Sequence, residues 1–249
     1  MGILSGRLLR MLLVAACAAL PAAGQRAQNR KFLVLLDPGH TPKMPGARSS
    51  QGLYEREYNQ TIARLLMDRL GKDGDIDVNS TNGTEESVGL SQRVKMAATL
   101  KADLFLSLHH DSVQLSYLRP WTFNGAERKY CDDFKGFSIH AATVQDKPVA
   151  EKSYRFAQIA AKKMMQQGFP FTLHHEEKIE GEDMKLLDRS LGIYERNHLA
   201  VLWNNKSPAV LVECGIIVNR DEERRLQDPA VQGQIVEALY QAVREYKDK

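Results

Sequence analysis

Three apolar runs of the sequence lead directly into residues that can bind a metal ion or transfer a proton. The runs LVLL, LFLSL and AVLV precede His40, His109 and Glu213, and a further acid, Glu55, stands at the start of the first predicted helix. In an α/β sheet, binding sites form where strands end and loops begin. Two imidazoles and a carboxylate leave one tetrahedral position open on a catalytic zinc ion, and an acid that is not a ligand can act as general base.

The spacing of these residues does not establish a metal site by itself. A single histidine after a strand is more often a hydrogen-bonded turn residue than a ligand, so the motif DPGH, which ends at His40, is weak evidence when taken alone. Asp37 lies three residues before His40 and has two interpretations. It could accept a ring N–H from a ligand and fix its tautomer, or it could cap the Pro-Gly turn.

The elements that must position these residues alternate along the chain. Apolar runs predict strands at 31–36, 76–81, 102–112, 136–142, 199–203 and 209–215, and helical periodicity predicts helices at 55–70, from Ser91 onward, at 154–167 and at 231–246. Residues 113–135 lack clear periodicity, and residues 169–190 are mixed and charged. The alternation indicates a single α/β domain, with a twisted, mostly parallel or mixed sheet and helices on both faces.

Composition excludes several classes of protein. Of the 249 residues, 43% are hydrophobic and 26% charged, which is typical of a globular domain rather than a disordered chain. The formal charge of +3 includes Arg7 and Arg10, which have no acid beside them. Charge therefore gives no reason to expect a nucleic-acid partner.

The N-terminus is typical of a secretory signal. Residues 1–24 combine two arginines, a short apolar stretch and the small residues PAAG, and residues 25–31 are a polar, flexible lead-in. The apolar stretch is shorter than the roughly 20 residues that a transmembrane helix needs, so we expect an exported protein without a membrane span. Alternatively, Cys17 in VAAC is the lipidated cysteine of a lipoprotein, a reading that we favour less because the apolar run continues past it.

Two cysteines remain after cleavage of the predicted signal. An exported protein could pair Cys131 with Cys214. Because Cys214 follows a strongly apolar strand, we favour a buried free thiol.

Four blocks of sequence, in the same order, resemble one enzyme family. They are LLDPGHTPKMPGA, GLYEREYN, LSQRVKMAATLKADLFLSLHHDS and SPAVLVECGIIVNRDEE. The chain resembles the zinc-dependent N-acetylmuramoyl-L-alanine amidases of the Amidase_3 type, which are bacterial cell-wall hydrolases. The resemblance runs from about residue 32 to residue 246 and is least certain between residues 113 and 187.

The resemblance implies a role for each of the four candidate residues. His40, Glu55 and His109 match the zinc ligands of the family, and Glu213 matches its catalytic acid. The implied reaction cleaves the amide between N-acetylmuramic acid and L-alanine of the stem peptide, in the periplasm or cell envelope. Zinc would polarise the carbonyl, and Glu213 would take a proton from the attacking water and pass it to the leaving nitrogen. A monomeric catalytic domain over residues 32–249 is expected.

Some nearby residues match the family and others depart from it. Asn59 and Arg93 match and are interpreted as structural, and Asp111 and Ser112 as loop-shaping residues. His110 is a departure; if His109 faces the metal, His110 points elsewhere, because side chains alternate along a strand. Thr41 stands where relatives often have glycine, which puts the loop conformation in question. His140, His174, His175 and His198 lack ligand spacing and are expected to be ordinary polar residues, although LHHEE, at residues 173–177, could lie near the groove.

The region 113–187 is longer than in compact members of the family. Some members carry an inserted helix here that covers the zinc until an activator protein moves it. Residues 176–187 could be such a segment, with Glu177, Glu180 or Glu182 as a blocking carboxylate. We favour the alternative, a surface loop that frames the groove for the glycan, since length alone does not identify a lid.

Two other functions compete with the amidase. One is a metal-dependent hydrolase of the same fold that acts on a small acyl-amino acid, which the secretory signal disfavours. The other is a non-catalytic peptidoglycan-binding or activator-like module. Loss of a ligand or of Glu213 would support that module, and the sequence retains all four residues.

Overall fold

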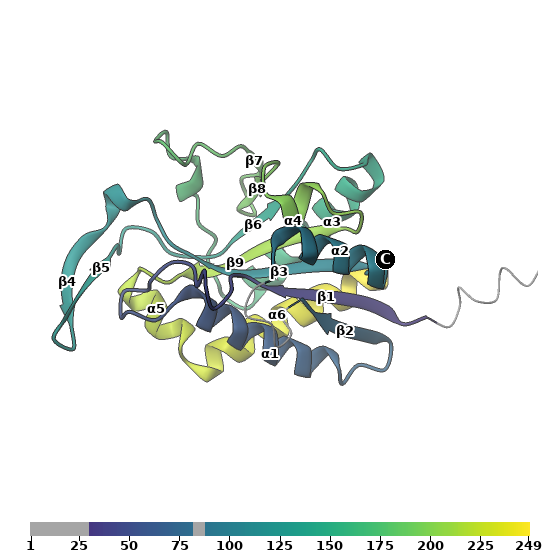
Figure 1. The fold of residues 1–249 in the computed structure, drawn as a ribbon, viewed down its shortest axis with the longest axis horizontal. Coiled ribbons are helices and arrows are strands. Elements are labelled where there is room, and N and C mark those ends of the chain that lie inside the picture. Colours follow the sequence, from purple (N-terminus) through teal and green to yellow (C-terminus); the bar gives the residue numbers. More distant parts are fainter. Residues whose placement is uncertain (1–29, 82–87) are drawn as a thin grey trace, which may run out of the picture. The chain divides into compact units, whose positions relative to one another are not determined.

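Seven strands form one mixed sheet, and the apolar runs of the sequence lie in its central strands (Figure 1). In spatial order they are β2 (Ile76–Ser80), β1 (Phe32–Pro38), β3 (Leu104–Asp111), β9 (Ala209–Ile216), β6 (Ser138–Ala141), β8 (Ile193–Glu195) and β7 (Leu186–Asp188). β2, β1, β3 and β9 are parallel, β6 is antiparallel to β9 and parallel to β8, and β7 is antiparallel to β8. The carboxyl ends of β1, β3 and β9 therefore meet at one edge.

Alternate residues of the central strands face two separate cores, because successive side chains of a strand point to opposite faces. The helices are α1 (Glu55–Leu70), α2 (Leu90–Leu100), α3 (Lys147–Gln166), α4 (Ala200–Trp203), α5 (Arg220–Leu226) and α6 (Pro229–Lys247). Val34 and Leu36 pack with α1, α3 and α6, whereas Leu35 packs with α2 and α4. The predicted α/β domain with helices on both faces is confirmed.

The computed structural model describes residues 30–81 and 88–249, and Lys31–Lys249 form one compact unit. The expected signal peptide and Cys17 lie outside the described residues, as does nearly all of the lead-in. Within the described ranges, no helix is long and apolar enough to cross a membrane. Cys131 and Cys214 are buried and free, as predicted.

The strand predicted at residues 199–203 is wrong. Ala200–Trp203 form the short helix α4, whose Val201 and Leu202 are buried in the core beside α2. A short apolar run fits a buried strand or a buried helical turn equally well, so periodicity could not decide between them. The helix predicted from Ser91 onward is α2, which begins one residue earlier, at Leu90, with Gly89 and not Ser91 as its N-cap.

Residues 113–135 contain a hairpin that periodicity did not reveal. After a 3-10 turn at Leu115–Tyr117, β4 (Arg119–Phe123) and β5 (Ala126–Tyr130) pair in an antiparallel ladder that extends beyond the main sheet (Figure 1). Asn124 and Gly125 connect them with φ values of 50° and 76°. Positive φ at both turn residues matches the right-handed twist of a hairpin, and an Asn-Gly pair favours it.

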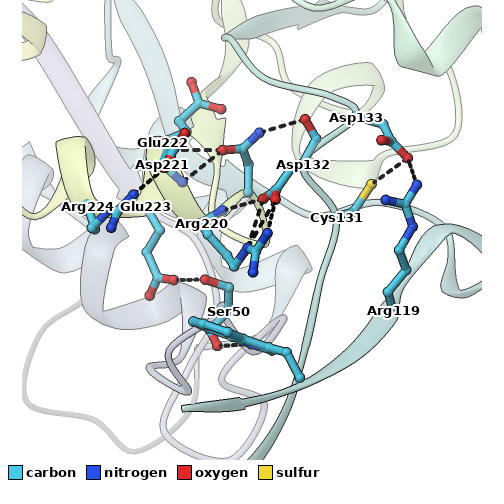
Figure 2. Close-up of polar contacts among 12 residues, drawn as sticks. Ser50, Arg119, Cys131, Asp132, Asp133, Arg220, Asp221, Glu222, Glu223 and Arg224 are labelled. Atoms are coloured by element: carbon cyan, nitrogen blue, oxygen red, sulfur yellow. Dashed lines mark hydrogen bonds and ion pairs between the residues drawn. The ribbon is translucent and has the colours of Figure 1, made fainter. Parts of the chain in front are cut away.

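Polar contacts fasten the base of this hairpin to the start of α5 (Figure 2). Arg220 Nε donates to Asp132 Oδ2 at 3.0 Å, and Asn219 Nδ2 donates to the carbonyl of Phe134 at 2.9 Å. One turn further along α5, Glu223 accepts a hydrogen bond from the hydroxyl of Ser50. The hairpin and the loop that contains Ser50 are therefore held to the same helix.

Candidate functional site

The structure brings His40, Glu55 and His109 together at the carboxyl edge of the sheet. The Glu55 carboxylate lies between the two rings, with Oε2 2.7 Å from His40 Nε2 and Oε1 2.9 Å from His109 Nδ1. Their side chains are 27%, 7% and 18% exposed, in the order His40, Glu55, His109, so solvent reaches the group. One ligand atom from each residue lies within 4.8 Å of the others, a spacing that suits one metal ion.

Hydrogen bonds from nearby residues orient the Glu55 carboxylate. The backbone N–H of Ala47 donates to Oε2 at 3.2 Å, and Asn59, one helical turn further along α1, donates from Nδ2 to Oε1 at 3.3 Å. Burial raises the pKa of Glu55, but the hydrogen bonds and the electrostatic attraction of His109 and His40 outweigh burial and bring the pKa well below its ordinary value. The Glu55 carboxylate is therefore anionic.

His110 points away from this group, as the alternation along β3 predicted. Its side chain is almost fully buried, its Nδ1 lies 2.8 Å from Asn59 Oδ1, and its ring lies against Tyr58. Burial lowers the pKa of His110 to about 3, so the ring is neutral. His110 thus supports Asn59, which in turn holds Glu55, and it does not face the groove.

Asp37 acts on the loop around His40 through Arg93. Arg93 Nη1 donates to Asp37 Oδ1 at 2.6 Å and to the carbonyl of Pro38 at 2.9 Å, and Nη2 donates to the carbonyl of His40 at 2.9 Å. Asp37 also accepts hydrogen bonds from Thr81 and Ser107. Within the described residues, the partners of Asp37 are these side chains and not the ring of His40.

Replacing Arg93 with methionine is expected to lower the free energy of unfolding by about 3–5 kcal/mol, because it leaves the buried Asp37 carboxylate without its charged partner. Both side chains are almost fully buried, so solvent does not weaken the pair. The loss also releases the carbonyl of His40, and we therefore expect weaker zinc binding. Urea unfolding and a zinc titration measure the two effects.

Arg64→Met is a matched control for the loss of an arginine. Arg64 pairs with Asp68 on the exposed surface of α1 with both side chains open to solvent. Such a pair contributes about 0.3–0.5 kcal/mol. Equal destabilisation by the two substitutions would contradict the role given to Arg93.

Two glycines let the chain pass close to the candidate ligands. A Cβ on Gly39 would lie 2.2 Å from the His109 ring, and one on Gly46 would lie 2.5 Å from Glu55 Oε2. His40 itself has φ of 72°, an uncommon conformation for a residue other than glycine. Thr41 follows in a turn with paired hydrogen bonds to Met44. The positive φ is thus taken at His40, and the missing glycine at position 41 does not prevent a tight loop.

Glu213 is the register partner of His109 on the neighbouring strand β9. The register of β3 and β9 then shifts between His109 and Asp111, an irregularity often found beside active sites. Glu213 Oε2 is buried and makes no hydrogen bond to any described residue. Burial raises the pKa of Glu213 well above its usual value, and the negative charges of Asp111 and Glu55 add to this. A raised pKa favours a carboxyl group that can take up a proton and release it again.

The comparisons with known proteins agree with this geometry. The profile of Amidase_3, described as N-acetylmuramoyl-L-alanine amidase, matches residues 34–245. The chain belongs to this family. It is 25% identical to the N-acetylmuramoyl-L-alanine amidase AmiC of Escherichia coli, over 91% of this chain and 55% of AmiC. It therefore spans little more than half the length of that relative.

Solved structures of family members share the fold. An N-acetylmuramoyl-L-alanine amidase of Clostridium difficile 630 superposes with a TM-score of 0.66 at 24% identity, covering 89% of this chain and 99% of that one. The CwlD amidase of Clostridioides difficile, solved in complex with the GerS lipoprotein, gives a TM-score of 0.65 at 18% identity, covering 88% and 99%. At these identities the likeness concerns the fold.

A groove of about 760 Å³ adjoins the candidate ligands in this member of the Amidase_3 family. Its walls are the β4–β5 hairpin, the loop at residues 47–49 and the segment after Asp111. Ala47, which donates to Glu55, lies on the groove, and Arg48, Arg128 and Lys129 give it cationic groups. Glu127 is also in the lining, so the three cationic groups outnumber the acidic one.

Sequence reasoning missed a second group of residues beside the first. Asp111, expected only to shape the loop, lies with His174 and His175, which were expected to be ordinary polar residues. Both histidines are almost fully buried, and each has a ring nitrogen within 3.4 Å of the same Asp111 oxygen. The segment 173–177 does reach the site region. Its contact with Asp111 could not be predicted, because the two lie far apart in the sequence and no motif links them.

The segment 176–187 does not form the inserted helix of the lid hypothesis. It follows a 3-10 turn at His174–Glu176 and ends as β7 begins at Leu186. Glu182 Oε2 lies 2.8 Å from His175 Nδ1, and Gln114 donates to Glu182 Oε1 at 3.1 Å. Glu182, one of the acids suggested as blocking groups, thus contacts His175 and Gln114 and not His40, Glu55 or His109.

Proposed function

We propose that this chain hydrolyses the amide between the lactyl group of N-acetylmuramic acid and L-alanine of the peptidoglycan stem peptide. The observation that carries the proposal is the convergence of His40, Glu55 and His109, with Glu213 in register beside His109. Family membership supports the same reaction. Because the chain spans only part of AmiC, we infer the activity for the domain that it contains.

The three residues fit zinc by their chemistry. Two neutral imidazoles and one carboxylate are the donors of a common type of catalytic zinc site, which keeps a position open. The low pKa of Glu55 supports an anionic ligand, and Asn59 and the N–H of Ala47 fix its two oxygens. Zinc bound there would polarise the substrate carbonyl and acidify the attacking water.

Glu213 is proposed to move the proton. A carboxylate with a raised pKa accepts a proton from the attacking water more readily than an ordinary one, and then donates it to the leaving nitrogen of L-alanine. Protonation of that nitrogen matters because an amide anion is a very poor leaving group. The buried Oε2, free of hydrogen bonds among the described residues, leaves Glu213 available for this exchange.

We further propose that the protein is exported and that its groove receives the substrate. Peptidoglycan lies outside the cytoplasm, in agreement with a signal peptide at residues 1–24. Arg48, Arg128 and Lys129 would attract the carboxylates of the stem peptide. Because the CwlD amidase was solved in complex with the GerS lipoprotein, we also propose that this chain binds a partner protein.

The test is product identification on intact sacculi. Zinc-loaded protein lacking residues 1–24, a deletion outside the compact unit, is expected to release stem peptides that begin with a free L-alanine amine. Mass spectrometry of the soluble and residual fractions identifies the bond that is cut. Intact lactyl amides after prolonged incubation with metal-loaded, folded protein would exclude the proposal.

A further inference from the structure

Asp111, His174 and His175 form a second cluster of metal-binding side chains, separate in its residues from the first. Asp111 Oδ2 lies 2.9 Å from His175 Nε2 and 3.4 Å from His174 Nε2. Each residue offers one ligand atom within 4.8 Å of the others. Asp111 belongs to β3, whereas the histidines belong to the loop between α3 and β7, so the cluster joins two distant parts of the chain.

The three converging atoms are buried and make no hydrogen bond to a described residue. They are Asp111 Oδ2, His174 Nε2 and His175 Nε2. Asp111 Oδ2 lies within ion-pair distance of both ring nitrogens. Buried polar atoms almost always have a hydrogen-bond partner. Three buried atoms that face one another without such a partner therefore indicate a ligand that all three share. Side chains that share a metal ion show this pattern, because each lone pair points at the ion.

The other polar atoms of these three side chains have hydrogen-bond partners, which hold the side chains in place. His174 Nδ1 lies 3.0 Å from Thr172 Oγ1, His175 Nδ1 lies 2.8 Å from Glu182 Oε2, and Asp111 Oδ1 accepts the N–H of Ser112 at 2.8 Å. A carboxylate on one ring nitrogen fixes the proton there and leaves the other nitrogen free to bind a metal, an arrangement typical of zinc-binding histidines. Glu182 has this relation to His175.

We propose that the second cluster binds a divalent transition-metal ion, with zinc as the best match to its donors. Ligand bonds of about 2.0–2.1 Å in a tetrahedron place ligand atoms roughly 3.3 Å apart. The two separations from Asp111 Oδ2, 2.9 and 3.4 Å, lie on either side of that value. Two imidazoles and a carboxylate suit zinc better than magnesium or calcium, which prefer oxygen ligands. The ion ties the loop that contains His174 and His175 to β3.

Metal counting tests this proposal without any assay of peptidoglycan cleavage. The purified full chain is stripped with a chelator, reloaded with zinc, desalted and analysed by mass spectrometry of the metal. We expect two zinc ions in the wild-type protein, one in His174→Gln/His175→Gln, and one in His109→Ala. His198→Gln, a change to an exposed histidine, is expected to keep two.

One outcome overturns the second site: a wild-type protein that holds a single zinc, with the same single zinc in the His174→Gln/His175→Gln variant. The cluster would then be an ion pair between a charged His175 and its two carboxylates. His109→Ala keeps the second cluster unchanged, so it tests the proposal even if the double variant does not fold, and zero zinc in folded His109→Ala contradicts it. A protein that binds two ions but leaves lactyl amides intact would refute only the proposed function.

Discussion

We expect Glu213→Gln to lower the rate of stem-peptide release by about 100- to 10,000-fold and to leave the proposed zinc binding by His40, Glu55 and His109 unchanged. Glutamine keeps the size of the side chain but cannot carry the proton from water to the leaving nitrogen. Because Glu213 lies beside His109 in register and not among the three converging atoms, we expect metal binding not to depend on it. Kinetics on soluble muropeptide, with zinc content measured on the same sample, give both results.

Glu195→Gln is the control for this substitution. Glu195 lies on β8 and contacts Thr143 and Lys185 at the surface, so its loss should leave the rate near that of the wild type. If Glu213→Gln retains more than about a tenth of the activity, the general acid and base must be another group. If it instead loses zinc together with activity, Glu213 belongs to the metal site.

His109→Ala is expected to abolish both zinc binding at the first site and activity. Changes to residues that only support a ligand cost about 10- to 100-fold in metal affinity, so loss of a ligand should cost more than 100-fold. The imidazole also contacts Glu55 Oε1, so its removal takes away one of the contacts that hold this carboxylate between the two rings. Zinc titration and activity at saturating zinc measure the effect.

His110→Ala is the neighbouring comparison. His110 reaches Glu55 through Asn59 and its own backbone, so its loss should weaken zinc binding by no more than the supporting range of about 10- to 100-fold. Activity should return when zinc is added in excess. Equal effects of His109→Ala and His110→Ala would contradict the assignment of ligand and support.

Some of the fold was predictable because its residues repeat with a clear period. Glu55–Leu70 is the helix that the spacing of its apolar residues predicts, and the buried run before Asp37 is β1. The run at 199–203 was too short to distinguish a helix from a strand. The β4–β5 hairpin carries half-buried and exposed residues, so its alternation gave a weak hydrophobic signal.

The candidate site was likewise predictable only in part. His40, His109 and Glu213 follow apolar strands, and parallel pairing brings strand ends together, so their proximity could be expected from the sequence. The second cluster could not, because His174 and His175 lie in a loop whose path depends on contacts such as Glu182 with Gln114. Arg93 matched the family, but only the structure shows that it holds the carbonyl of His40.

The loop before α1 connects the wall of the groove to the candidate zinc ligands. Trp121 on β4 donates to the carbonyl of Ser50, Arg128 on β5 donates to that of Gln51, and Ala47 in the same loop donates to Glu55. A shift of the hairpin would therefore reach, through this loop, the carboxylate that lies between His40 and His109. The hairpin and the Glu55 carboxylate are thus attached to the same five residues of backbone, from 47 to 51.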